Sequence, residues 1–527
     1  MHIPVMNPIG LAVLPAYLLV TLLIGWLSRR AGQSANSFLN ASRALSLPIV
    51  SASFLAANCG ALEIIGLSAL AAQHGVQAFH FYWIGAIPAM VFLSLWMMPI
   101  YRKSGLHSVP EYLGIRFGPR VRVLNACIVG MTMLLLAGVS LYAMAQVLEV
   151  MFGFTFLRGI LLSAGVVLAY TFLGGIRATI YTEVFQLLVM VAGLLPLCLQ
   201  TSRLALQRGQ DSAHTHLWPA GPFHDASSPL DSFGVSLGLG FVLSFGYWCT
   251  DFVLMQRALA ARTDFAARQV PLWAGFGKLA FSFLVVLPGL AACRVLPTAG
   301  HGTSFDQTLP RIMALFYGPT MLGLGLTALA ASLMSGLAAN VSGFAALWTE
   351  DIYRSWLAPH HAEAHYLRMG RLATFIAILL SVAASYVSFC FGNLMDQVQL
   401  IFALFSAPFW AVFLLGMLTR RATARGALSG LLAGVLLAMV HHLCVLRGWL
   451  TYGSLMSANF HVAIYAFACS LVVGWLLSAR PEGISAIENR PLFLHWRTGL
   501  SGQNIGLLWI VSGLLLASCA CLNFIWR

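Results

Sequence analysis

Long apolar runs recur along almost the whole chain, and they restrict its possible folds more than any other feature. A helix of about 20 apolar residues crosses the hydrocarbon core of a bilayer. Of the 527 residues, 59% are hydrophobic and only 9% are charged. We therefore predict an all-α polytopic membrane protein with about 14 transmembrane helices. The predicted spans are 9–27, 47–69, 78–100, 124–152, 159–173, 184–206, 233–255, 272–296, 312–348, 372–391, 397–418, 426–445, 461–478 and 505–524.

The net charge of +13 could indicate a nucleic-acid partner, but the basic residues gather in alternate loops between the predicted spans. Cytoplasmic loops of membrane proteins carry an excess of Lys and Arg, so these loops are predicted to face the cytoplasm. Because the number of spans is even, both termini are then outside. The charge reflects topology in the lipid bilayer, and no nucleic-acid partner is expected. The basic loops are 28–46, 101–123, 174–183, 256–270, 349–371, 419–425 and 479–504.

No predicted loop is long enough to form a separate domain, since the longest have only about 26 residues. We therefore expect a single transmembrane transporter domain over residues 1–527. No predicted outer loop carries an N-x-S/T glycan signal, which favours the inner (plasma) membrane of a bacterium. The outer loop 207–232 contains His214, His216 and His224. Their irregular spacing favours a solvated loop over a metal site.

The second span, 47–69, is interrupted at its midpoint by Asn58, Cys59, Gly60 and Glu63. Irregular backbone at membrane depth is tolerated only where it lines a cavity or is buried in protein. A carboxylate at that depth is costly and marks a functional site by default. The alternative is a core helix in which Glu63 simply pairs with a neighbour.

A second interrupted span, 233–255, contains Gly240, Ser244, Gly246, Thr250 and Asp251. Four uninterrupted spans separate it from the first, which is the spacing of two five-helix units in inverted-repeat transporters. We expect core repeats at about 47–206 and 233–418. The peripheral helices are then 9–27, 426–445, 461–478 and 505–524, and Gly426, Gly430 and Gly434 form a helix-packing face on the second of these.

Glu63 and Lys278 are opposite charges at membrane depth, where each alone would cost about 2.5–3.5 kcal/mol on insertion scales. Pairing with each other, or through a bound solute, reduces this cost. Lys278 lies near the start of its span, so its amine could instead extend to the membrane interface. Tyr82, Trp83 and Tyr247 fit either ordinary aromatic packing or the walls of a binding cavity.

Six segments resemble the sodium/solute symporter family, which includes the sodium/glucose and sodium/galactose cotransporters. They are SFLAANCGALEIIG (53–66), HSVPEYLGIRF (107–117), FLGGIRATIYTEVFQ (172–186), GYWCTDFVLMQRALAAR (246–262), TEDIYR (349–354) and GMLTRRATARGALSGLLAGVL (416–436). The resemblance extends from about residue 10 to 440. It implies 14 helices with outside termini, a LeuT-type core of five-plus-five inverted repeats, and alternating access around a midplane site.

The resemblance also implies which residues bind the solute. The family's substrate positions correspond to Asn58, Glu63, Tyr82, Ser244, Tyr247, Lys278 and Gln399. Asn58, Lys278 and Gln399 keep the residue of the galactose transporter, and Tyr247 matches its inner gate. Leu62 and Tyr82 stand where that transporter has Glu, Ser244 where it has Asn, and Glu63 where it has Gln. Losing two carboxylates that accept sugar hydroxyls argues against the same substrate, so only a small polar organic solute is predicted.

A sodium site is implied between the break of the second span and the ninth span. Its ligands are the backbone carbonyls of Ala56, Cys59 and Ser332 and hydroxyls at Ser335 and Gly336, but Gly336 has none. A hard cation takes oxygen ligands, so losing one of five predicts weaker sodium binding than in relatives with both hydroxyls. Sodium is the expected coupling ion, and no other cofactor is expected.

We expect sodium-coupled symport by alternating access, and three other functions stay open. A carrier of the same fold could be proton-coupled through Glu63 or uncoupled. A transporter-like sensor is possible, although the chain ends at Arg527 without an output domain. An enzyme is not expected, because no H-E-x-x-H or G-x-S-x-G motif occurs in a fitting context.

Overall fold

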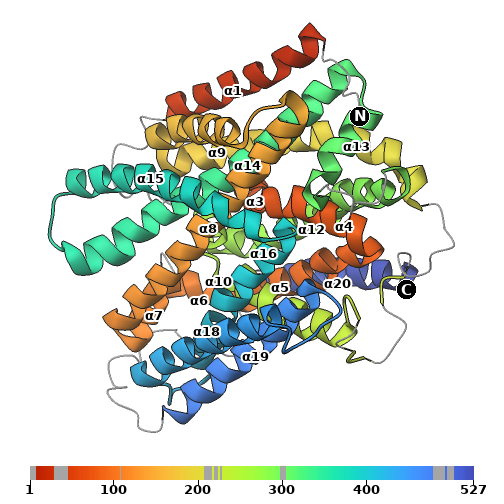
Figure 1. The fold of residues 1–527 in the computed structure, drawn as a ribbon. Helices are drawn as coiled ribbons and strands as arrows, with labels where there is room; N and C mark the ends of the chain where they lie inside the picture. Colours follow the sequence, from red (N-terminus) through yellow and green to blue (C-terminus); the bar gives the residue numbers. More distant parts are fainter. Residues whose placement is uncertain are drawn as a thin grey trace.

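The computed structural model describes residues 7–28, 45–106, 109–206, 216–218, 223–225, 228–296, 304–478, 493–494 and 504–526. Helices account for most of these residues, and the only β-pairing among them is an isolated bridge between Leu45 and Ala261. The predicted all-α fold class is confirmed. Figure 1 shows the helices as one bundle, with the start of the first helix and the end of the last on the same side of the view.

The bounds of the helices follow in chain order. The α-helices are α1 (Pro8–Ser28), α3 (Leu47–Asn58), α4 (Leu67–His74), α5 (Ile87–Phe92), α6 (Met98–Lys103), α7 (Val109–Phe117), α8 (Pro119–Phe152), α9 (Phe156–Leu206), α10 (Ser244–Thr250), α11 (Phe252–Leu259), α12 (Asp264–Val295), α13 (Thr308–Phe316), α14 (Pro319–Leu347), α15 (Glu363–Ser385), α16 (Leu394–Ile401), α17 (Ala407–Leu418), α18 (Ala424–Leu446), α19 (Leu455–Leu476) and α20 (Ile505–Ile525). The π-helical segments are η3 (Leu62–Gly66), η5 (Phe81–Ala86), η6 (Leu93–Met97), η8 (Gly234–Leu243), η10 (Trp348–Leu357) and η12 (Phe402–Ser406), and the 3₁₀ turns are η4 (Gly75–Phe79), η9 (Phe305–Gln307) and η11 (Tyr386–Cys390).

The predicted spans fall on helices, with two differences. Residues 159–173 and 184–206 belong to one helix, α9, and the predicted span 312–348 includes the end of α13 before α14 begins at Pro319. Eleven helices in the described part of the chain are long and apolar enough to cross a membrane, and two more spans are helix pairs bent at a short break. Phe156–Ala169 adds a shorter apolar stretch. The bent pairs are the second and seventh spans, which were the two predicted to be interrupted. They bend by 59° between Asn58 and Leu62 and by 49° between Thr250 and Phe252.

The predicted loop at 174–183 is wrong, because these residues belong to the continuous helix α9. Its polar residues suggested a solvated turn, but Glu183 is fully buried and has partners inside the protein. The Arg257 guanidinium donates to the Glu183 carboxylate over 2.6 Å, and the Ser53 hydroxyl donates to the same carboxylate. A helical segment whose polar residues have partners inside the protein can have the same composition as a short loop. Composition alone therefore did not distinguish the two.

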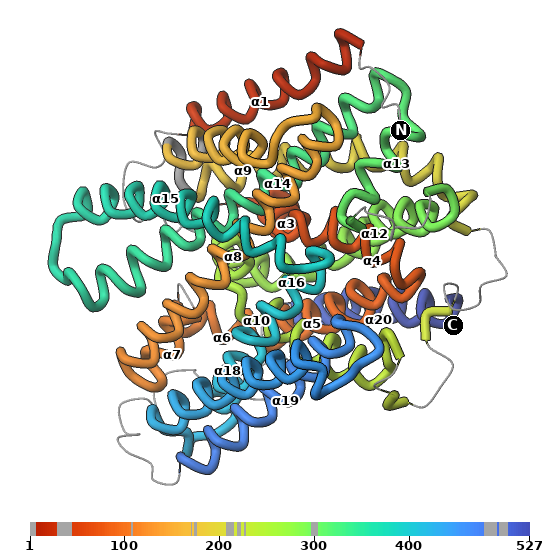
Figure 2. Tube along the Cα trace, viewed as in Figure 1, coloured from red at the N-terminus to blue at the C-terminus, as the bar shows by residue number. Residues whose placement is uncertain are grey.

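Helix α14 lies at the centre of the bundle, where it packs against α1, α8, α9 and α15. In the span that starts with α14, 89% of the residues in an apolar stretch of 18 are buried, compared with 22% in α1 and in α20. Figure 2 shows α1 along one edge of the bundle and α18 and α19 together along the opposite edge. The middle of the bundle, around α3 and α14, is therefore the part most completely enclosed by protein.

Small residues let α18 and α19 approach closely. A Cβ at Gly426 would lie 2.4 Å from the Gly474 carbonyl oxygen, and a Cβ at Gly430 would lie 2.5 Å from the Ser470 carbonyl oxygen. At Gly434 the obstacle would be the Ser470 hydroxyl, at 1.9 Å. Since lipid gives helices no hydrophobic drive to associate, this close packing is what joins the pair.

We predict that Gly430→Val destabilises the protein by about 1–3 kcal/mol, because an added side chain must separate the two helices. The purified protein should show a lower thermal midpoint in fluorescence-detected gel filtration. Gly513→Val in α20 is the matched control, since a Cβ there meets no atom within 4 Å. Equal shifts for the two variants would contradict close packing as the cause.

Candidate solute and ion site

The break of the second span joins α3 to η3 through three residues. The Cys59 N–H donates to the carbonyls of Leu55 and Ala56, and the Gly60 N–H donates to the Asn58 carbonyl over 2.9 Å. A Cβ on Gly60 would lie 3.2 Å from the Cα of Gly336, so α14 packs directly against the break. The unwound backbone is thus buried in protein, as membrane depth requires.

Directly after the break, Glu63 forms an ion pair with Lys278 of α12. The Lys278 Nζ lies 2.6 Å from Glu63 Oε1, and the Lys278 side chain is fully buried. The ammonium also lies 5.1 Å from the centre of the Tyr82 ring and 5.5 Å from that of Trp248, within the range of cation–π attraction. The amine therefore points into the protein and does not extend to the interface.

A narrow cavity of about 40 Å³ opens beside this pair. It is lined by Asn58, Leu62, Glu63, Leu67, Phe81, Leu239, Leu243, Ser244, Tyr247, Trp248, Met395, Gln399 and Phe402. We call it the first cavity. Five of the seven predicted solute residues line it, and the other two, Tyr82 and Lys278, adjoin it through Glu63. The space admits about three water molecules, so an organic solute requires the surrounding side chains to move apart.

Several buried oxygens of the first cavity have no hydrogen-bond partner. They are Oδ1 of Asn58, Oε2 of Glu63 and Oε1 of Gln399, judged over the described residues. The Nδ2 atom of the Asn58 amide donates to the Tyr247 hydroxyl over 2.8 Å. A buried polar atom without a partner costs free energy, so these oxygens favour a ligand that donates hydrogen bonds.

Tyr247 separates the first cavity from a second one of about 30 Å³. The second cavity is lined by Ile128, Val129, Thr132, Met133, Leu136, Gly246, Tyr247, Thr250, Asp251, Phe402, Phe405, Ser406 and Phe409. Tyr247 and Phe402 line both cavities, and their ring centres are 5.2 Å apart. The second cavity lies beside the bend of the seventh span, since Thr250 and Asp251 line it. This position fits the predicted gate role of Tyr247.

The predicted ion ligands are also brought together. The Ser332 hydroxyl donates to the Cys59 carbonyl over 2.7 Å, and the Ser335 hydroxyl donates to the Ala56 carbonyl over 3.3 Å. Gly336 lies on the same helix, where its missing side chain gives room to Gly60. A Cβ at 336 would also lie 3.4 Å from the Ser140 hydroxyl. The glycine is therefore tied to close helix packing, which the sequence did not reveal.

Trp248 is not among the residues that the sequence predicts to bind solute, yet it lines the first cavity and its ring faces Lys278. The sequence does not single out Phe402, although this residue lines both cavities. Trp248 could have been found as the aromatic residue beside Tyr247 on an interrupted span. Phe402 gives no such signal, because one phenylalanine in an apolar span looks like any other.

Comparisons with known proteins decide the family. The family model "Sodium:solute symporter family" matches residues 38–434, which is most of the chain. The chain belongs to the sodium:solute symporter family. It is therefore a transporter and not an enzyme, and its activity is sodium-coupled symport of a small solute by alternating access.

Individual relatives are more distant. The symporter is 27% identical over 449 residues to the sodium/glucose cotransporter of Vibrio parahaemolyticus, covering 79% of this chain and 82% of that protein. It is 26% identical to sodium/glucose cotransporter 1 of Sus scrofa, covering 80% of this chain and 70% of that protein.

Solved structures show the same fold. A Na⁺-coupled sialic acid symporter in a substrate-bound outward-open state superposes with a TM-score of 0.74 at 17% identity, covering 90% of this chain and all of that one. Mhp1, a nucleobase-cation-symport-1 family transporter, gives 0.56 at 13% identity over 88% of this chain and 97% of its own. Both likenesses concern the fold alone, and they agree with the predicted LeuT-type architecture.

The ion pair gives a prediction that separates stability from transport. Removing one partner of a buried pair leaves an uncompensated charge and costs about 3–5 kcal/mol, whereas replacing both is close to neutral. We expect Glu63→Gln and Lys278→Met each to lower the thermal midpoint and solute uptake of the symporter. The double variant should regain most of the stability but not the uptake. Wild-type uptake by the double variant would show that the pair is only structural.

Two variants of Tyr247 should distinguish the role of its ring from the role of its hydroxyl. Tyr247→Ala removes the barrier between the cavities, so preloaded solute should leave proteoliposomes faster in exchange assays. Tyr247→Phe keeps the ring but loses the bond to Asn58, so release should stay near the wild-type rate while affinity falls about fivefold, or ~1 kcal/mol. A release rate unchanged in Tyr247→Ala would exclude the gate.

Proposed function

We propose that the symporter carries a small polar organic solute that donates hydrogen bonds through hydroxyl or amino groups. The observation that carries this proposal is the set of three buried oxygens, on Asn58, Glu63 and Gln399, that lack partners in the described structure. An ionised carboxylate can only accept hydrogen bonds, so Glu63 in particular selects for a donor. Such a solute would supply what the cavity lacks.

The sugar for which the relatives are named belongs to a narrower class than the one proposed here. The two relatives above are named for glucose, which is rich in hydroxyl donors and so agrees with the class. Leu62 and Tyr82 stand at positions where the galactose transporter has carboxylates, so fewer sugar hydroxyls would be held here. We therefore propose the donor-rich class and not glucose itself.

The solute can bind to Glu63 without breaking the ion pair with Lys278. Glu63 and Lys278 carry no net charge together, and a solute that donates to Glu63 Oε2 would leave Oε1 paired with the amine. Tyr82 and Trp248 would then hold Lys278 from the other side. Binding would thus add a partner to the carboxylate without leaving the ammonium uncompensated.

We propose that sodium binds between the break of the second span and α14. Its ligands would be the carbonyls of Ala56, Cys59 and Ser332 and the hydroxyl of Ser335. Two of these carbonyls already lie within hydrogen-bond distance of serine hydroxyls on α14, which supports the convergence of oxygens there. Hard cations are held by such oxygens, and water is the ligand we expect at Gly336.

Proton coupling through Glu63 is the alternative that the sequence leaves open. It would require the carboxylate to gain and lose a proton during transport. The Glu63 carboxylate lies 2.6 Å from the Lys278 amine, so its protonation would leave the buried ammonium without its charge partner. Sodium coupling needs no such change at Glu63.

We propose that the symporter lies in the plasma membrane of a bacterium, its inner membrane. The end of the bundle that carries α7 would then face the cytoplasm. Arg102, Arg116 and Arg122 lie at this end, and two of them pair with Asp264 and Asp351. Under the positive-inside rule both termini would then be outside.

The test is uptake into proteoliposomes under an imposed sodium gradient, at constant pH and zero membrane potential. A panel of labelled polyols, sugars, amino acids and carboxylates should show concentrative uptake of a donor-rich member and none for carboxylates without donors. Uptake driven by a proton gradient but not by sodium would contradict sodium coupling. Accumulation of a solute without donor groups would contradict the proposed class.

A serine variant tests the ion site itself. Ser335→Ala should raise the sodium concentration for half-maximal uptake about tenfold or more, since a lost bond to a charged group costs about 1.5–3 kcal/mol. Ser342→Ala on the same helix is the control, because its hydroxyl donates to the Ala338 carbonyl within the helix. If Ser335→Ala and Ser342→Ala share the wild-type sodium dependence, Ser335 is not a ligand.

A further inference from the structure

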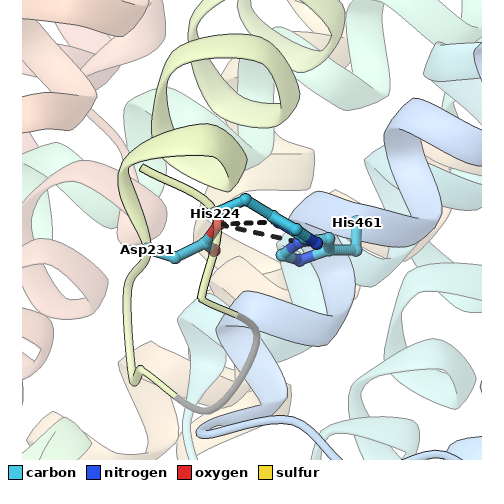
Figure 3. A group of neighbouring side chains, drawn as sticks. All are labelled: His224, Asp231 and His461. Carbon is cyan, nitrogen blue, oxygen red and sulfur yellow. Dashed lines mark ion pairs between the residues drawn. The ribbon is translucent and has the colours of Figure 1, made fainter. Parts of the chain in front are cut away.

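Three side chains far apart in the sequence meet at the edge of the bundle, away from the solute cavity. His224 comes from the segment that precedes η8, Asp231 lies just before η8, and His461 lies in the second turn of α19. In Figure 3 the Asp231 carboxylate faces both histidine rings, and a dashed line joins it to each of them. Its Oδ2 is 3.7 Å from His224 Nδ1 and 3.7 Å from His461 Nε2. One donor atom from each residue lies within 4.8 Å of the others.

The hydrogen bonding of His461 leaves its Nε2 atom without a partner among the described residues. Its Nδ1 lies 2.9 Å from the Ser457 carbonyl oxygen, which can only accept, so Nδ1 carries the proton. In the neutral ring Nε2 is then a lone-pair acceptor. The side chain is fully buried, and among the described residues Nε2 has no hydrogen-bond partner. It faces the Asp231 carboxylate, which is also an acceptor, at 3.7 Å, and two facing buried acceptors favour a positive charge between them.

Asp231 is held in place independently of the histidines. The Gly234 N–H donates to its Oδ2 over 3.0 Å, and the Ser457 hydroxyl lies 3.4 Å from its Oδ1. Asp231 is fully buried, whereas 56% of the His224 side chain is exposed. The carboxylate and His461 therefore form a fixed inner wall, and His224 closes the solvent side.

We propose that His224, Asp231 and His461 bind a zinc ion. Imidazole nitrogens and a carboxylate are ligands that zinc uses, and sites with three protein ligands keep a fourth position for water. A ligating histidine commonly donates its other nitrogen to a backbone carbonyl, as His461 does to Ser457. The pairs at 3.7 Å need to close only slightly around the ion. The exposed side at His224 provides the entry path and the water position.

The site connects to transport through the seventh span. Asp231 is three residues before Gly234, where η8 begins, and η8 continues into α10 with Ser244 and Tyr247 of the first cavity. On its other face η8 packs closely on α19, since a Cβ at Gly238 would lie 2.5 Å from the Phe460 carbonyl oxygen. Zinc would tie the outer half of the bent span to α19 and slow any movement between them.

Binding can be measured on the protein itself, without a transport assay. The purified symporter, without a histidine tag and stripped with chelator, is titrated with Zn²⁺ against a chromophoric competitor. We expect one tight site per chain. His224→Ala should weaken it at least tenfold. His216→Ala is the matched control, because His216 is an exposed histidine of the same outer segment that is not in the cluster. Co²⁺ in place of zinc should give the visible absorption of a four-coordinate ion in wild type and His216→Ala only.

A second variant and a flux measurement complete the test. Asp231→Asn keeps the shape of the side chain but removes its charge, and it should also weaken zinc binding at least tenfold. Zinc added on the side of this segment should slow uptake by wild type and leave His224→Ala unaffected. Equal zinc affinity in wild type and His224→Ala, or no tight site at all, would overturn the proposal.

Discussion

The structure depends on one constraint, that the unwound backbone of the second span must find partners at a depth where water is absent. The carbonyls of Ala56 and Cys59 accept hydrogen bonds from serine hydroxyls of α14. Gly60 and Gly336 let the break and α14 pack in direct contact. The most buried helix of the bundle is thus the one that holds the break. The cavity beside the break exists because α14 supplies both the polar partners and the close approach.

Two buried ion pairs neutralise charge across the two predicted repeats. Glu63 lies in the first repeat and pairs with Lys278 of the second, and Glu183 of the first pairs with Arg257 of the second. At the bend of the seventh span, Asp251 instead accepts the Leu254 N–H at the start of α11. The ion pairs therefore join the halves of the bundle at its middle, where a lone charge would be most costly.

The sequence predicted what composition and spacing can express. Apolar length indicated all the spans, and the polar residues near Glu63 and Asp251 indicated both bends. Residues 174–183 were misread as a loop, because partners such as Arg257 and Ser53 are distant in sequence and their pairing cannot be seen in it. Phe402 and His461 were missed for the same reason. Each is an ordinary residue of an apolar helix until folding places Tyr247 or Asp231 beside it.

The shared position of Tyr247 has a consequence for the kinetics of the transport cycle. Only its ring and that of Phe402 are common to both cavities, so this part of the barrier is about one side chain thick. Side-chain rotations occur within nanoseconds when space permits, whereas collective helix movements take microseconds to milliseconds. Because the two ring centres are only 5.2 Å apart, the rings can turn aside only after the bent spans have moved to give them room. We therefore expect solute release past Tyr247 to wait for that backbone movement and to have its steep temperature dependence.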